Sequence, residues 1–244
     1  MSAPLMSVRA LTVNFSGLRA LDRVSFSVIP GKITGIIGPN GAGKTTLFNV
    51  IAGHYRPSGG QIIFGERNIT GWKSDRVCRL GISRTYQHVR PFLGLSVYNN
   101  VKVGFLYGHQ AVNWKQKELS QEIASTLEFV GLEGLGEKRA EELIPLNRKR
   151  LEVARALATH PRLLLLDELI AGLTPTETLS MMETIRQINA KGITVLMIEH
   201  VMKAVMGLSD KVVVLHHGEV IAEGSPAQVA GDQAVIDAYL GAQH

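Results

Sequence analysis

The sequence of 244 residues predicts an α/β fold with a largely parallel sheet and helices on both of its faces. Two observations support this fold class. Short apolar and β-branched runs of strand length alternate along the chain with segments whose apolar residues recur at helical spacing. A glycine-rich loop over residues 38–43 also joins one such strand directly to a helix, a connection typical of α/β proteins.

The first part of the chain combines strand patterns with one helical pattern. Alternating apolar and polar side chains indicate half-buried strands, and a β-branched run that ends at Gly38 indicates a buried strand. The elements expected here are strands over 7–15, 23–29 and 32–37, a helix over 45–52 and a strand over 61–64.

The middle of the chain, over residues 88–147, contains few strand-like runs. Its apolar residues fall at helical spacing over 119–130, which predicts a mostly helical lobe. We expect this lobe to interrupt a single domain whose α/β core covers 1–87 and 148–244. The later core elements are expected to be helices over 148–159, 176–189, 201–208 and 234–240, strands over 163–166, 193–198 and 211–215, and the segment 218–222.

Composition excludes several classes of protein. With 45% hydrophobic and 19% charged residues the chain is globular in composition. No apolar run approaches the roughly 20 residues of a membrane span, and residues 1–11 lack the pattern of an export signal. Cys78 is the single cysteine, which fits a reducing compartment. The net charge of +5 is spread along the chain, which favours a mildly basic surface over a nucleic-acid site.

The strongest motif is Gly-Pro-Asn-Gly-Ala-Gly-Lys-Thr at residues 38–45, which fits the phosphate-binding pattern G-x-x-x-x-G-K-[ST]. Its glycines let main-chain N–H groups converge on phosphate oxygens, and the following helix adds the positive end of its dipole. Lys44 is expected to reach the β- and γ-phosphates of a nucleotide, and the Thr45 hydroxyl to ligate Mg²⁺. The alternative is a chance glycine-rich turn, which the flanking strand and helix disfavour.

A second motif follows the apolar run 163–166, where Asp167 and Glu168 come directly after an expected buried strand. Ligands bind at the carboxyl ends of parallel strands. Asp167 is therefore expected to hold Mg²⁺ through water, and Glu168 to polarise the attacking water as general base. Alone, an Asp-Glu pair after a strand is more often a surface turn, but here it lies about 120 residues after a phosphate-binding loop.

In order and spacing, the loop at 38–45, Gln87, Asp167-Glu168 and His200 resemble the ATP-binding subunits of ABC transporters. The chain is similar in particular to the ATPases of branched-chain amino acid importers in Arg84-Thr85-Tyr86-Gln87-His88, in 150–155, in Ile198-Glu199-His200, and in 221–224 and 236–241. The resemblance implies a P-loop NTPase core with a mostly parallel sheet, an N-terminal antiparallel β subdomain and the inserted helical lobe. It implies ATP and Mg²⁺ as cofactors.

The resemblance also implies roles for single residues. Phe15 stands where the family stacks an aromatic ring on adenine, although a strand core residue is the alternative. Gln87 would contact Mg²⁺ and the attacking water, and His200 would contact the γ-phosphate. The expected nucleotide-binding residues are Phe15, Gly38, Pro39, Asn40, Gly41, Ala42, Gly43, Lys44, Thr45 and Thr46; the expected metal ligands are Thr45, Gln87 and Asp167; the expected catalytic residues are Glu168, His200 and Gln87.

The chain departs from the family at the signature segment, usually Leu-Ser-Gly-Gly-Gln, which one subunit presents to the ATP of the other. Here residues 143–147 read Leu-Ile-Pro-Leu-Asn. Ile144 has no hydroxyl, Pro145 has no N–H, and Leu146 replaces a glycine. The N-terminus of the following helix survives, because Pro is tolerated in a first helical turn. Leu169 and Thr174 also replace the usual Pro and Asp or Asn. A subfamily that tolerates a divergent signature is the alternative explanation.

These departures predict a heterodimer with one competent and one degenerate ATP site, and low ATPase activity for the isolated chain. The expected partners are membrane-spanning permease subunits, a second ATPase subunit with an intact signature and, indirectly, a periplasmic or extracellular solute-binding protein, with no nucleic acid. The expected location is the cytoplasmic face of the plasma membrane, as a peripheral subunit. Two alternatives remain open: a catalytically weak regulatory ATP-binding subunit, and a soluble ABC ATPase not tied to transport.

Overall fold

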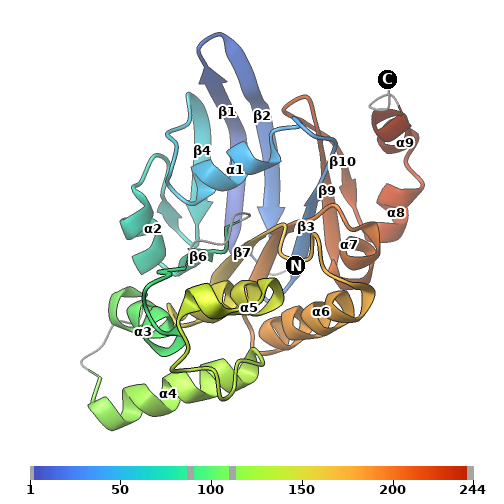
Figure 1. Ribbon diagram of the computed structural model, residues 1–244. Coiled ribbons are helices and arrows are strands. Elements are labelled where there is room, and N and C mark those ends of the chain that lie inside the picture. Colours follow the sequence, from blue (N-terminus) through green and yellow to red (C-terminus); the bar gives the residue numbers. More distant parts are fainter. Residues whose placement is uncertain (1–2, 87–90, 110–113, 241–244) are drawn as a thin grey trace.

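The computed structural model describes residues 3–86, 91–109 and 114–240. Its larger sheet has six strands in the order β10-β9-β3-β8-β7-β6 (Figure 1). Five of these strands, β9, β3, β8, β7 and β6, run parallel to one another. The edge strand β10 pairs with β9 in the antiparallel sense. The strand bounds are β3 Ile33–Ile37, β6 Ile82–Arg84, β7 Leu163–Asp167, β8 Thr194–Ile198, β9 Lys211–His216 and β10 Glu219–Gly224. The predicted mostly parallel α/β sheet is confirmed.

A smaller sheet of four antiparallel strands has the order β2-β1-β4-β5. Its strands are β1 Met6–Phe15, β2 Leu18–Val28, β4 Gly59–Phe64 and β5 Arg67–Asn68. Ser16 and Gly17, with φ of 40° and 95°, form the two-residue turn between β1 and β2. Positive φ at both turn residues matches the right-handed twist of the flanking strands. The predicted N-terminal antiparallel sheet is confirmed, and Phe15 lies at the tip of its first hairpin.

Helix α1 (Lys44–Ile51) packs between the two sheets, and a second group of helices covers the opposite face of the larger sheet. Strand β7 shows the division, because Leu163 and Leu165 belong to the core with α1, while Leu164 and Leu166 pack toward the other helices. Those helices are α5 Pro145–Leu157, α6 Pro175–Ala190 and α7 Met202–Leu208; α5 and α6 are visible below the sheet in Figure 1. Because the helices cover the two faces of the sheet, the polar loops that follow β3, β7 and β8 lie at the carboxyl ends of these strands.

Helices α3 (Val97–Tyr107) and α4 (Gln116–Phe129) pack with α5 at one end of the molecule, the lower left in Figure 1. Ser96 caps α3 by accepting a hydrogen bond from the Asn99 N–H, at 3.1 Å. The fully buried Asn100 bonds the main chain of residue 92 and so closes the loop before the helix. The limits of the helical lobe, 88 and 147, stay a prediction.

Several elements differ from the sequence prediction. Strand β2 begins at Leu18 rather than 23, because main-chain pairing with β1 continues through the polar residues near the turn. Helix α5 begins at Pro145 rather than 148, since Pro at a first helical position needs no N–H donor. Short helices escaped the periodicity analysis because one or two turns hold too few apolar repeats: α2 Ser74–Arg79, η1 Ala140–Glu142 and α8 Pro226–Ala230. Helix α9 covers Gln233–Leu240.

In the part of the chain that the structure describes, no helix combines the length and the apolarity needed to cross a bilayer.

Candidate functional site

The glycine-rich loop between β3 and α1 depends on backbone conformations that favour glycine. Gly38, Gly41 and Gly43 have φ of 150°, 79° and 99°, all outside the range of ordinary L-residues. A Cβ atom added at Gly38 would lie 2.0 Å from the Leu215 carbonyl oxygen, and one at Gly43 would lie 2.6 Å from the Ala20 oxygen. The glycines therefore allow both the turn and the close approach of neighbouring main chain.

Lys44, the first residue of α1, is 6% exposed. Its Nζ donates hydrogen bonds to the carbonyl oxygens of Gly38, at 2.7 Å, and Pro39, at 2.8 Å. Burial lowers the pKa of the Lys44 ammonium, and the nearby carboxylates of Glu168 and Asp167 oppose that shift. The loop thus wraps around a cation at the N-terminus of a helix, an arrangement that suits phosphate oxygens.

A cavity of about 540 Å³ opens beside this loop. This volume lies in the range of small-molecule sites. It brings together residues from five distant parts of the chain: the β1–β2 hairpin, the glycine-rich loop with the start of α1, the end of β7, the loop after β8 and the loop after β9. The lining residues are Phe15, Leu18, Arg19, Ala20, Asn40, Gly41, Ala42, Gly43, Lys44, Thr45, Thr46, Glu168, His200 and His217.

Glu168 and His200 lie side by side in this cavity. The His200 Nε2 atom and the Glu168 Oε1 atom are 2.7 Å apart and share a hydrogen bond. Glu168 follows β7 with φ of 49°, a left-handed conformation that is unfavourable for a residue other than glycine by about 1–3 kcal/mol. Its N–H donates to the Ile198 carbonyl at 2.9 Å, which ties the end of β7 to the end of β8. The carboxylate is thus held at the cavity wall by a strained but bonded backbone.

Asp167 lies behind the cavity wall rather than on it, with 2% exposure. Its Oδ2 atom accepts a hydrogen bond from Arg84 at 2.6 Å, and Arg84 also donates to the Asn49 side chain of α1 at 2.7 Å. Within the described residues Oδ1 has no hydrogen-bond partner. A buried carboxylate oxygen without a partner fits a role in holding hydrated Mg²⁺. Gln87, the other expected metal ligand besides Thr45, lies outside the described residues.

Sequence reasoning missed part of this site. The sequence pattern assigns no role to Arg84, although it forms a buried ion pair with Asp167. Leu18 and Arg19 reach the cavity because the turn at 16–17 folds β2 back beside Phe15. The Phe15 ring is 40% exposed and packs edge-on against Tyr55, with 5.3 Å between ring centres. The dipeptide Ser16-Gly17 after a strand was the available signal for this hairpin.

The segment 143–147, which stands where the family has its signature, lies about 100 residues after the glycine-rich loop 38–43. Leu143 is buried, and Leu146 packs partly buried against the core. Ile144 is 59% exposed and stands at the N-cap of α5 without a side-chain capping bond. Pro145 is the first residue of the helix, three positions before the predicted start at 148. The segment therefore offers a helix N-terminus and an apolar side chain to its surroundings, and no hydroxyl.

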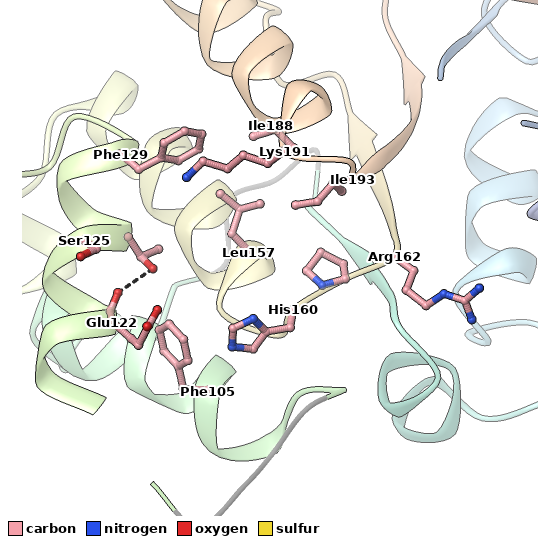
Figure 2. A pocket seen from close by; sticks show the side chains of 12 residues that line it. Phe105, Glu122, Ser125, Phe129, Leu157, His160, Arg162, Ile188, Lys191 and Ile193 are labelled. Atoms are coloured by element: carbon pink, nitrogen blue, oxygen red, sulfur yellow. Dashed lines mark hydrogen bonds between the residues drawn. The ribbon is translucent and has the colours of Figure 1, made fainter. Parts of the chain in front are cut away.

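A second cavity, of about 370 Å³, lies between α3, α4 and the residues that follow α5 and α6 (Figure 2). Figure 2 shows Phe105 close to His160, and the Lys191 chain reaching over the Phe129 ring, where its Nζ lies 3.7 Å from the ring centre. None of the described residues that line this cavity belongs to the glycine-rich loop. It is therefore separate from the site of Lys44 and Glu168.

Two family models match the sequence. Residues 21–171 match the family described as "ABC transporter", and residues 219–244 match the family described as "Branched-chain amino acid ATP-binding cassette transporter". The first match contains the glycine-rich loop, Asp167 and Glu168, and it covers more than half of the chain.

Individual relatives are similar over nearly their whole length. The chain is 40% identical to the high-affinity branched-chain amino acid transport ATP-binding protein LivG of Escherichia coli strain K12, with 99% of both chains covered. It is 39% identical to BraF of Pseudomonas aeruginosa, which has the same description, again over 99% of both chains. Among solved structures, the ADP conformation of MJ1267, an ATP-binding cassette of an ABC transporter, matches with a TM-score of 0.89 and 33% identity, over 98% of this chain and 100% of that one.

Proposed function

This chain belongs to the ABC transporter ATP-binding family, and from that premise we propose that it binds and hydrolyses ATP to power a membrane importer. One observation carries the proposal: Phe15, Lys44, Glu168 and His200, which are far apart in the sequence, line a single cavity of about 540 Å³. The descriptions of LivG and BraF support branched-chain or related amino acids as the solute class. No side chain of this cavity would contact the solute.

The geometry supports a division of labour among the chain's own residues. The exposed ring of Phe15 would stack on adenine, and the main-chain N–H groups of loop 38–43 would bond the phosphates. Lys44, held by two carbonyls, would place its positive charge beside the β- and γ-phosphates. Glu168 would take the proton of the attacking water, and His200, bonded to that carboxylate, would fix its orientation.

Mg²⁺ is the expected cofactor with ATP, and when bound it would neutralise charge on the transferred phosphoryl group. Thr45 lines the cavity, so its hydroxyl can reach a cation beside the phosphates. The Oδ1 atom of Asp167 would hold a water of that cation, while Oδ2 stays bound to Arg84. The residues present thus fit a hydrated divalent cation.

The remaining partners are proposed from family membership. Permease subunits would supply the membrane-spanning part, and the ATPase chain would lie at the cytoplasmic face. A solute-binding protein outside that membrane would act only indirectly. The C-terminal match of residues 219–244 to a branched-chain-specific family supports this assignment over an ABC ATPase not tied to transport.

The segment 143–147 supports a heterodimer with unequal sites. Ile144 stands exposed at the N-cap, where the family presents a hydroxyl to the γ-phosphate in the other subunit. Loss of one transition-state donor typically lowers the rate by a factor of about 10²–10³. We expect the site built on this chain's own loop to need a partner with an intact signature, and the reciprocal site to turn over slowly.

The first experiment tests the catalytic assignment in the assembled transporter. Lys44→Ala is expected to abolish ATP binding, and Glu168→Gln to retain binding while lowering kcat about 10²–10⁴-fold. Lys32→Ala is the matched control, because that lysine pairs with Asp210 at the surface, away from the cavity. If Glu168→Gln hydrolyses ATP at the wild-type rate, the assignment is wrong. If Lys44→Ala stops transport although wild-type hydrolysis is undetectable, the chain is a regulatory ATP-binding subunit instead.

A second experiment tests the unequal sites. The chain is titrated with its cognate second ATPase, and hydrolysis is expected to rise until the two are equimolar. Restoring the signature by Ile144→Ser, Pro145→Gly, Leu146→Gly and Asn147→Gln is expected to raise the ATPase rate of the isolated chain. A rate that changes in neither experiment would show that the degenerate segment does not limit activity.

A further inference from the structure

Lys149 on α5 has an unusual set of partners. Its ammonium donates hydrogen bonds to three main-chain carbonyl oxygens of the segment that follows β7: Leu169 and Ala171, each at 2.7 Å, and Glu168, at 3.3 Å. An ammonium group has three protons to donate, so the hydrogen-bonding capacity of Lys149 is directed at one stretch of four residues. That stretch begins with the proposed general base.

Glu199 reaches the same stretch from the other side. It directly precedes His200 and is 1% exposed. Its Oε1 atom accepts a hydrogen bond from the Ile170 N–H at 2.8 Å. The carboxylate thus joins the loop after β8 to the loop after β7.

The two side chains together fix the backbone of residues 168–171. Carbonyls 168, 169 and 171 are bonded to Lys149, and the N–H of residue 170 is bonded to Glu199. Glu168 needs such support, because its φ of 49° is unfavourable for a glutamate. A backbone held in this way directs the Glu168 side chain toward His200, 2.7 Å away.

We propose that Lys149 and Glu199 are positioning residues for ATP hydrolysis, which hold the 168–171 segment so that the Glu168 carboxylate and His200 face the γ-phosphate together. This inference rests on the function proposed above. Lys149 also lies in the second turn of α5, whose first turn begins at Pro145 in the altered signature segment. The Lys149 side chain therefore connects two places. One is the helix that begins in segment 143–147, which would face the ATP bound by the second subunit, and the other is Glu168, the proposed general base for the ATP bound by this chain.

The charges of the cluster support this assignment. Burial lowers the pKa of Lys149, and the carboxylates of Glu199 and Glu168 oppose that shift. Burial raises the pKa of Glu199 to about 7, against the effects of the Ile170 N–H, Lys149 and the His200 N–H. A buried carboxylate beside a half-buried ammonium generally stabilises a fold no better than apolar residues of similar volume. Their presence here is explained by the main-chain groups that they orient.

The test compares Lys149→Met and Lys149→Arg in the full-length chain assembled with its partner ATPase and permease. Lys149→Met keeps the length of the side chain and removes its donors, so the 168–171 segment loses three bonds. Because a displacement of about 1 Å at a catalytic group can lower the rate about 100-fold, we expect kcat to fall about 10- to 100-fold. KM for ATP and the affinity for Mg²⁺–ATP should stay within about two-fold, since the glycine-rich loop is intact. Lys149→Arg should recover most of kcat.

Arg150→Met is the matched control. Arg150 is the next residue of the same helix and also bonds neighbouring elements, through the Gly131 carbonyl at 3.0 Å and the Ser180 hydroxyl at 3.2 Å. It does not reach residues 168–171, so its loss should leave kcat within about two-fold of wild type. Glu199→Leu, which removes the acceptor for Ile170, should lower kcat as Lys149→Met does, and Glu199→Gln should retain more of it.

Three results would overturn the inference. They are an unchanged kcat in Lys149→Met, a KM that rises in parallel with the fall in kcat, and an equal loss of kcat in Arg150→Met. Circular dichroism and a thermal unfolding midpoint show whether each variant is folded. If Lys149→Met is not folded, Glu199→Leu carries the test, because the same loss of kcat is expected from it. Failure of the proposed function itself is distinguishable, because the wild-type complex would then hydrolyse no ATP.

Discussion

Replacing the charged Arg84 side chain with an apolar one, by Arg84→Met, should strongly lower the free energy of unfolding. The Arg84 and Asp167 side chains are only 6% and 1% exposed, and their closest atoms are 2.6 Å apart. The substitution leaves the Asp167 carboxylate buried without its cation. It also removes the bond to Asn49 and the packing of the guanidinium over the Phe48 ring.

Two estimates of the magnitude agree. Two unit charges about 4 Å apart attract by about 4 kcal/mol at the effective dielectric constant of about 20 that suits protein sites. Removing one partner of a buried pair typically lowers the free energy of unfolding by about 3–5 kcal/mol. For a chain of 244 residues, each kcal/mol shifts the unfolding midpoint by about 2–4 °C, so the midpoint should fall by about 6–20 °C.

Urea unfolding measures the effect, with Arg84→Met, Asp167→Asn and the double variant forming a cycle. The double variant should be more stable than the sum of the single losses predicts, because it leaves no unpaired charge. Arg186→Met is the control: its ion pair with Glu183 is about half exposed, so its loss should lower stability by less than about 1 kcal/mol. An Arg84→Met variant within 1 kcal/mol of wild type would refute the reasoning.

Three further predictions concern the same region. The pKa of Glu199 is raised from 4.5 to about 7, so between those pH values the folded protein keeps a proton that the unfolded chain releases. The wild type should therefore lose about 3 kcal/mol of stability from this group as pH rises from 4.5 to 7. Glu199→Gln should remove this loss in urea unfolding at pH 5 and pH 8, and equal pH slopes in the two proteins would contradict it. Gly43→Ala should abolish ATP binding measured by calorimetry, since a Cβ would lie 2.6 Å from the Ala20 oxygen at φ of 99°; binding of wild-type strength would disprove this. Phe15→Ala should weaken ATP and ADP binding equally, by about 5- to 100-fold for the loss of one stacking contact, whereas an effect limited to ATP would exclude adenine stacking.

Much of the fold could be predicted from the sequence because its elements carry strong periodic patterns. Strands β7 and β8 are continuous apolar runs buried on both faces, and α6 and α4 repeat apolar residues each turn. Helix boundaries were less certain, as at Pro145, because a first turn can recruit residues without helical periodicity. Elements of one or two turns, such as α2, in which only Val77 is buried, contain too few apolar residues to show a helical period.

Thr174, which replaces the usual Asp or Asn of the family, caps the N-terminus of α6. Its hydroxyl accepts a hydrogen bond from the Glu177 N–H, and Glu177 bonds back to the Thr174 N–H at 2.8 Å, so the pair caps α6. Asp or Asn would also cap a helix at this position. The substitution thus preserves the start of α6, which the sequence comparison alone did not show.

The sequence by itself determined the chemistry that is contiguous along the chain. The loop 38–45 and the pair Asp167-Glu168 can each be recognised from a few consecutive residues. Phosphate binding by a loop, for example, depends on closely spaced glycines and their N–H groups. Tertiary structure alone decided the contacts between residues far apart. Arg84 meets Asp167 across 83 positions, Lys149 reaches Ala171 across 22, and Glu199 reaches Ile170 across 29. A charged residue within a helix or after a strand most often faces water. Only the packing of α5 and the parallel strands brings these three side chains to the backbone groups and the carboxylate that they hold.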